Sequence, residues 1–69
     1  DMNKAIQLYQ QAVQLGNSNA MSNLAICYEN GQGIEKDMNK AIQLYQQAVQ
    51  LGNSGAMNGL AICYENGHG

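Results

Sequence analysis

The stretch DMNKAIQLYQQAVQLGNSNAMSNLAICYENGQG, residues 1–33, decides the fold because it returns almost unchanged at residues 37–69. Of the 33 aligned positions, four differ between the copies: Asn19/Gly55, Ser22/Asn58, Asn23/Gly59 and Gln32/His68. Ile34-Glu35-Lys36 joins the copies, so the period is 36 residues. A fixed period of this size is typical of proteins built from stacked structural units. We therefore treat residues 1–69 as a single segment with a first unit, 1–36, and a near-identical second unit, 37–69.

The first part of each unit is predicted to be an amphipathic helix. In residues 1–15, the glutamines occupy one half of a helical wheel and the apolar side chains occupy the other. Asp1 and Asp37 suit helix N-caps, and Gly16 and Gly52 suit the left-handed position after a helix. The apolar half consists of Met2, Ala5, Ile6, Leu8, Tyr9, Ala12, Val13 and Leu15.

A second helix is predicted from Asn19 to Asn30, capped by Asn17 or Ser18 and ended by Gly31. After it, Ile34 is expected to fold back as an apolar anchor. No stretch alternates between apolar and polar residues with period 2, so the sequence predicts no strand. The expected fold is all-α, an αα-solenoid with four helices. The apolar arc of the second helix consists of Ala20, Met21, Leu24, Ala25, Cys27 and Tyr28.

Composition excludes several classes of function. The net charge is −2 with only three Lys+Arg, so a nucleic-acid-binding surface is not expected. No apolar run reaches the ~20 residues of a membrane span, so membrane insertion is not expected. At 45% hydrophobic and 12% charged residues, the chain is also too apolar for a typical disordered segment.

Residues Ala20 to Gly52 spell A-x-x-x-L-A-x-x-Y-x-x-G-x-G-I-x-x-D-x-x-K-A-x-x-x-Y-x-x-A-x-x-x-G. This pattern resembles the Sel1-like repeat, a relative of the tetratricopeptide repeat, whose own period of 34 fits less well. The resemblance implies a right-handed α-solenoid that serves as a scaffold for other proteins, without catalysis. It also implies one complete unit, from about Asn19 to Gly52, between two half-units. Ala25, where the family often has Gly, and Gly59, inside the last helix, depart from the pattern.

The two ends of such a segment are expected to expose apolar surface, because a solenoid unit buries its apolar face only against neighbours. Two explanations are open. The chain is a window of a longer array, or separate copies stack head-to-tail into a filament. The partners are then other proteins, further copies of the chain, or more of the same repeat. The residues expected to mediate stacking are Met2, Ile6, Tyr9, Val13, Met57, Leu60 and Tyr64.

Ile26 and Ile62 lie in the polar arc of the second helix of each unit, among asparagines. The family resemblance places this helix along the concave groove, where the two isoleucines are candidates to anchor a partner. Three of the four copy differences fall on the same helix. They indicate either a groove tuned to a ligand or drift at sites free of packing constraint, and Gly59 favours drift by suggesting a loosened end. The candidate partner-binding residues are Asn19, Ser22, Asn23, Ile26, Asn30, Asn58, Ile62 and Asn66.

No pattern predicts an enzyme, a cofactor or a metal site. Cys27 and Cys63 are one period apart, so their helices should be roughly 10 Å apart, too far for a disulfide. We expect two buried free thiols, which favour a reducing compartment. The only histidine, His68, is expected to be an exposed loop residue. The four tyrosines stand at apolar helical positions, where core packing with the hydroxyl at the rim is expected.

Overall fold

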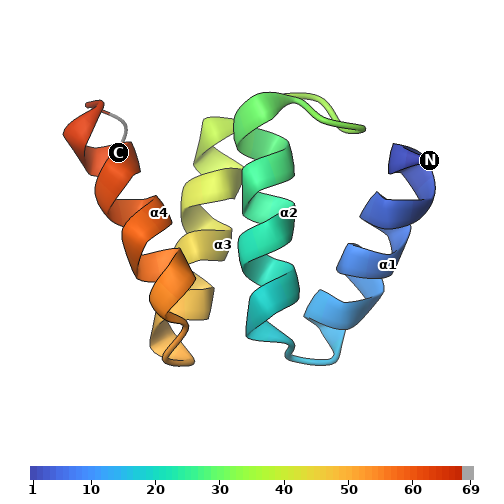
Figure 1. Cartoon of the computed structure of the whole chain (residues 1–69), viewed down its shortest axis with the longest axis horizontal. Helices are drawn as coiled ribbons and strands as arrows, with labels where there is room; N and C mark the ends of the chain where they lie inside the picture. The colour runs from blue at the N-terminus through green and yellow to red at the C-terminus, as the bar shows by residue number, and fades with distance from the viewer. Residues whose placement is uncertain (68–69) are drawn as a thin grey trace.

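The computed structural model describes residues 1–67 and confirms the all-α fold. Its helices are α1 (Met2–Gln14), α2 (Ser18–Asn30), α3 (Met38–Gln50) and α4 (Ser54–Glu65), with no strand in the described range (Figure 1). The helices form two pairs joined by the loop at residues 31–37. This is the helix-pair architecture of a solenoid.

Each helix begins where an Asp or Asn side chain accepts a hydrogen bond from a free backbone amide. Asp1 accepts from the amide of Asn3 (2.9 Å), and Asp37 accepts from that of Lys40 (3.1 Å). For α2, the cap is Asn17, so the helix begins at Ser18, one residue earlier than predicted. Gly16, Gly31 and Gly52 all have the predicted left-handed conformation after a helix.

The loop after α2 packs back on α1 through Gly33 and Ile34. Gly33 has φ +68°, and a Cβ there would lie 2.8 Å from the Met2 Cβ atom, so the position needs glycine for both backbone and space. Ile34 is half-buried against Ile6, Leu24 and Cys27, which confirms that it acts as an anchor.

The helices form a slab of 31 × 24 × 14 Å in which α2 and α3 have the largest interface. α2 contacts α1, α3 and α4, whereas α1 contacts α2 alone. α3 lies behind the space between α2 and α4 (Figure 1). The outer surfaces of α1 and α4 are therefore the two ends of the stack.

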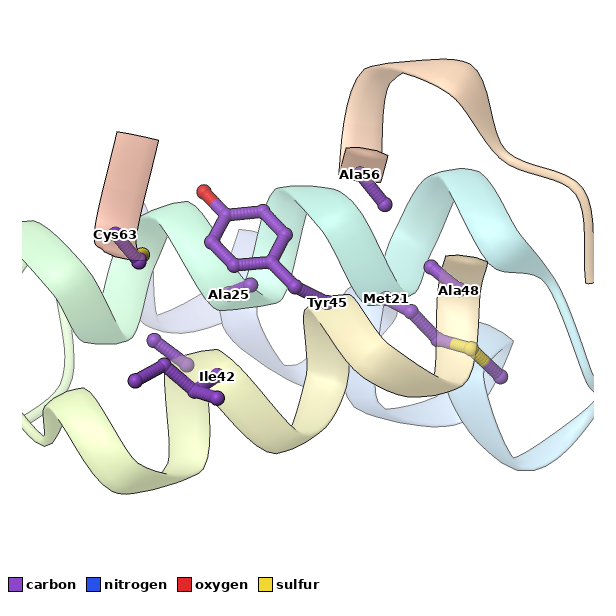
Figure 2. Packing of buried hydrophobic residues seen from close by; sticks show 8 residues of the cluster. Met21, Ala25, Ile42, Tyr45, Ala48, Ala56 and Cys63 are labelled. Atoms are coloured by element: carbon purple, nitrogen blue, oxygen red, sulfur yellow. The ribbon is translucent and has the colours of Figure 1, made fainter. Parts of the chain in front are cut away.

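Small residues let the central helices approach closely. Ala25, Ala41, Ala48 and Ala56 are fully buried where α2, α3 and α4 meet. The Tyr45 side chain extends from α3 into this region (Figure 2). The core is completed by Met21, Ile42 and Cys63.

Two leucines of the first unit lie outside the core, contrary to the predicted apolar face. Leu8 and Leu15 are exposed, although the wheel places them with the core residues. Leu15 lies at the C-cap, where the helix ends. Leu8 is exposed because α1 packs on α2 alone, whereas its counterpart Leu44 is half-buried against both core clusters.

Candidate functional site

A hollow of about 800 Å³ lies between α2 and α4, with Tyr45 of α3 beneath it. We call it the α2–α4 groove. It brings together all the candidate partner-binding residues except Asn66, and their role in binding stays a prediction. Its lining is Asn19, Ser22, Asn23, Ile26, Glu29, Asn30, Tyr45, Asn53, Ser54, Gly55, Asn58, Gly59 and Ile62.

Ile26 and Ile62 are the large apolar side chains exposed in the groove. Their exposed fractions are 41% and 51%, and neither belongs to a core cluster. They stand one period apart on α2 and α4, with amide side chains around them. The groove therefore offers two aliphatic contacts separated by one repeat.

Asn53 connects the two walls of the groove. Its Oδ1 accepts from the amide of Ala56 (2.8 Å) and from Ser22 Oγ (3.1 Å). Its Nδ2 donates to Asn19 Oδ1 (2.8 Å) and to Ser18 Oγ (3.2 Å). Asn53 is equivalent to Asn17 in the repeat, which indicates that it caps a helix. Its hydrogen bonds to α2 depend on the distance between the helices, so the residues next to Asn53 in the sequence do not predict them.

Tyr45 and Glu29 form a second link across the groove floor. The Tyr45 hydroxyl donates to Glu29 Oε1 at 2.9 Å. Burial raises the pKa of Tyr45 strongly, and the hydrogen bond and the charge of Glu29 raise it further, so the phenol stays neutral. Glu29 is the charged side chain of the groove, and no lysine of the described residues lines it.

Gly59 makes room for the Tyr45 ring. A Cβ at position 59 would lie 2.5 Å from Tyr45 Cε1 and 2.6 Å from Cζ. α4 continues past it to Glu65, and the space for the Tyr45 ring gives Gly59 a packing role, while the interpretation that it loosens the end of the helix stays a prediction. Drift at unconstrained sites is wrong for Asn19 and Ser22, because both hydrogen-bond to Asn53.

Both cysteines are buried and unbridged. Burial raises the pKa of the Cys27 thiol, and burial together with the nearby Glu29 charge raises that of Cys63. Neither environment favours the thiolate, so both residues behave as small apolar core groups.

His68 lies outside the described residues. Within residues 1–67, no three metal-binding side chains gather, and no helix is long and apolar enough to cross a membrane.

A second hollow, of about 430 Å³, lies between α1 and α3 and was not predicted. Lys40 Nζ lies 5.6 Å from the centre of the Tyr28 ring at this site, a cation–π distance. Val13, Leu24 and Leu44 line the hollow, but they also belong to the core clusters. The remaining lining consists of Gln10, Gln14, Gln43 and Gln47.

The candidate stacking residues differ in exposure, from exposed to buried. Met57 is 47% exposed, whereas its counterpart Met21 is 7% exposed. Tyr64 and Met2 are also exposed, and Leu60, Tyr9 and Val13 are half-buried. Ile6 is buried against Leu24 and Cys27, so it is not part of an exposed surface. On α4, a shallow apolar hollow of about 230 Å³ is lined by Val49, Met57, Leu60, Ala61 and Tyr64.

The fold and these inter-unit contacts define a helix-pair repeat protein. The family model described as Sel1 repeat matches residues 1–17, 18–53 and 54–69, so the chain belongs to the Sel1 repeat family, as the sequence pattern predicted. The middle match holds α2 and α3, the two helices with the largest interface. Sel1 repeats generally mediate protein–protein interaction. Neither the curated proteins nor the solved structures gave a match.

Proposed function

We propose that the chain is a non-enzymatic scaffold whose α2–α4 groove binds an extended peptide segment of another protein. The observation that carries this proposal is the exposure of Ile26 and Ile62 in one hollow, outside the core. Membership of a family that generally mediates protein interaction supports it. The hollow between α1 and α3 is a weaker candidate because it is smaller and its aliphatic side chains already pack in the core.

The groove lining defines the chemistry of this partner. Aliphatic side chains of the peptide would cover Ile26 and Ile62. The amides of Asn23 and Asn58 carry both donors and acceptors, which suit the backbone groups of an extended chain. Since Glu29 is the charged residue of the lining, the peptide should be neutral or basic, not acidic.

Selection from a phage-displayed library of linear peptides tests this function. Selected peptides should be rich in aliphatic residues and should bind the chain with Ile26→Ser and Ile62→Ser roughly tenfold more weakly or worse, because two apolar contacts are lost. The control is Leu15→Ser, an equally apolar exposed residue away from the groove. Unchanged binding to the double variant, with unchanged circular dichroism, would show that the peptides bind elsewhere.

A second candidate function is head-to-tail stacking of copies into a filament. It is favoured by the exposure of α4 residues, such as Met57, whose counterparts in α2 are buried by α3. α1 has the same sequence as α3, so each copy carries the helix that could cover the α4 of another. A head-to-tail contact of this kind can repeat without closing.

Sedimentation velocity and electron microscopy over a range of concentrations test stacking. The chain should form larger species as concentration rises, and Ala61→Lys should abolish them because a charged side chain would enter the apolar contact. Asn39→Lys, on an exposed position of α3, is the charge-matched control. A single monomeric species at every concentration would rule this function out.

A further inference from the structure

We propose that the residues at positions 55, 58 and 23 weaken the docking of a second copy on α4. The contact between the two units of one chain, which we call the internal junction, is then favoured over the junction between copies. This inference rests on the stacking candidate above. It concerns three of the four positions at which the two units differ. Each of these positions, or its counterpart in the other unit, has a defined contact at the internal junction.

The apolar hollow on α4 has a counterpart at the internal junction. The residues one period of 36 before its lining residues are Val13, Met21, Leu24, Ala25 and Tyr28. These residues pack in the clusters that hold α3. Residues 1–18 are identical to residues 37–54, so α1 of a second copy carries the matching surface. The occupant of the α4 hollow is therefore a second copy of this chain.

The hydrogen bonds of the internal junction have no full equivalent between copies. Inside the chain, Asn53 bonds to Asn19 and Ser22 of α2. Between copies, Asn17 of the second copy would face Gly55 and Asn58 of the first. Gly55 has no side chain, so the 2.8 Å bond made by Asn19 is lost. Asn58 is larger than Ser22, so its amide needs a different geometry to reach Asn17.

The tyrosine contacts of the internal junction are also lost at the junction between copies. The Tyr45 ring can pack beside α4 because Gly59 has no Cβ that would clash with it. In a docked second copy, Tyr9 would take the place of Tyr45, and Asn23 would stand where Gly59 stands. Asn23 therefore obstructs the position from which Tyr9 would donate to Glu65, the counterpart of Glu29.

The triple variant Asn23→Gly, Gly55→Asn, Asn58→Ser gives the copy-to-copy junction the residues of the internal junction. By sedimentation velocity it should self-associate at a concentration roughly tenfold or more below that of the unmodified chain. Asn23→Gly alone and the Gly55→Asn, Asn58→Ser pair should each give part of the effect, and circular dichroism checks that each variant stays folded. Gln32→His, the remaining copy difference, is the matched control and should change nothing.

The outcomes separate this inference from the stacking function. If the unmodified chain associates and the triple variant associates no more strongly, the inference is wrong and stacking stands. If neither associates at any concentration, both are wrong. Adding Ala61→Lys to the triple variant should return it to monomer, and association that survives this change would mean that the contact is not on α4.

Discussion

At position 59, a local preference and a tertiary contact oppose each other. Gly→Ala in the middle of a helix normally stabilises by ~1 kcal/mol. The new methyl group, however, would lie 2.5 Å from the Tyr45 ring, which is only 3% exposed and is held by its hydrogen bond to Glu29. Overpacking of this kind costs about 1–3 kcal/mol, so Gly59→Ala should lower the free energy of unfolding, measured by urea denaturation.

Gly55→Ala is the matched control on the same helix. A Cβ there would meet only the Asn53 Oδ1 atom, at 3.3 Å. This variant should be neutral or slightly more stable than the unmodified chain. If Gly59→Ala is as stable as Gly55→Ala, Tyr45 does not fill the space under position 59.

The buried thiols and the buried phenol make stability depend on alkaline pH. Burial raises the pKa of Cys27, Cys63 and Tyr45 in the folded chain. Above the ordinary thiol pKa of about 9, the unfolded chain loses protons that the folded chain keeps. The free energy of unfolding should therefore be constant between pH 7 and 8 and fall as the pH rises further.

Denaturation at neutral pH and at a pH above 10 measures this loss. Replacing both cysteines with alanine should leave a smaller alkaline loss, due to Tyr45, even though the variant is less stable throughout. A loss of the same size in that variant would show that the thiols do not contribute.

At the scale of the helix, Asn17 and Asn53 cap equivalent helices, α2 and α4, but have different surroundings. Both accept from a backbone amide three residues on. Asn53 also bonds to Ser18, Asn19 and Ser22 across the groove. Asn17→Ala should cost about 1 kcal/mol, and Asn53→Ala about 1–2 kcal/mol more, in chemical denaturation. Equal costs would mean that the bonds to α2 add no stability.

Helices and their caps were predictable because their causes lie within a few residues. Asp1, Asp37 and the glycines after each helix act on the backbone next to them. The Asn53 bonds and the Tyr45–Glu29 pair were missed because they join helices of neighbouring units. Helical periodicity placed Ile26 and Ile62 among polar residues, and the family resemblance placed that helix face along a groove, which all the candidates except Asn66 line. Neither indicated which of these residues also hold α2 and α4 together.

At the scale of the whole molecule, residues in equivalent positions have different environments. Met21 is 7% exposed inside the stack and Met57 is 47% exposed at its end. Burying a methionine side chain makes truncation to alanine cost about 2–5 kcal/mol, so Met21→Ala should destabilise the dilute chain by more than twice as much as Met57→Ala.

Calorimetry at low and high concentration extends this test. If copies stack, the cost of Met57→Ala should rise towards that of Met21→Ala as the concentration increases. A cost that is the same at all concentrations would show that nothing covers α4. The repeat predicted that the ends expose apolar surface, but periodicity could not assign Leu8 to the outside, because Leu44 in an identical helix is half-buried.

The shared sequence of α1 and α3 also bears on how such a gene can change. Because α1 and α3 have the same sequence, either helix carries the apolar surface that packs on the preceding unit. An in-frame gain or loss of one period would therefore bring together helix surfaces that already match. No compensating substitution would be needed in the apolar contacts. Only the few positions that distinguish the units would then need adjustment, so array length can evolve faster than the contacts that hold the array together.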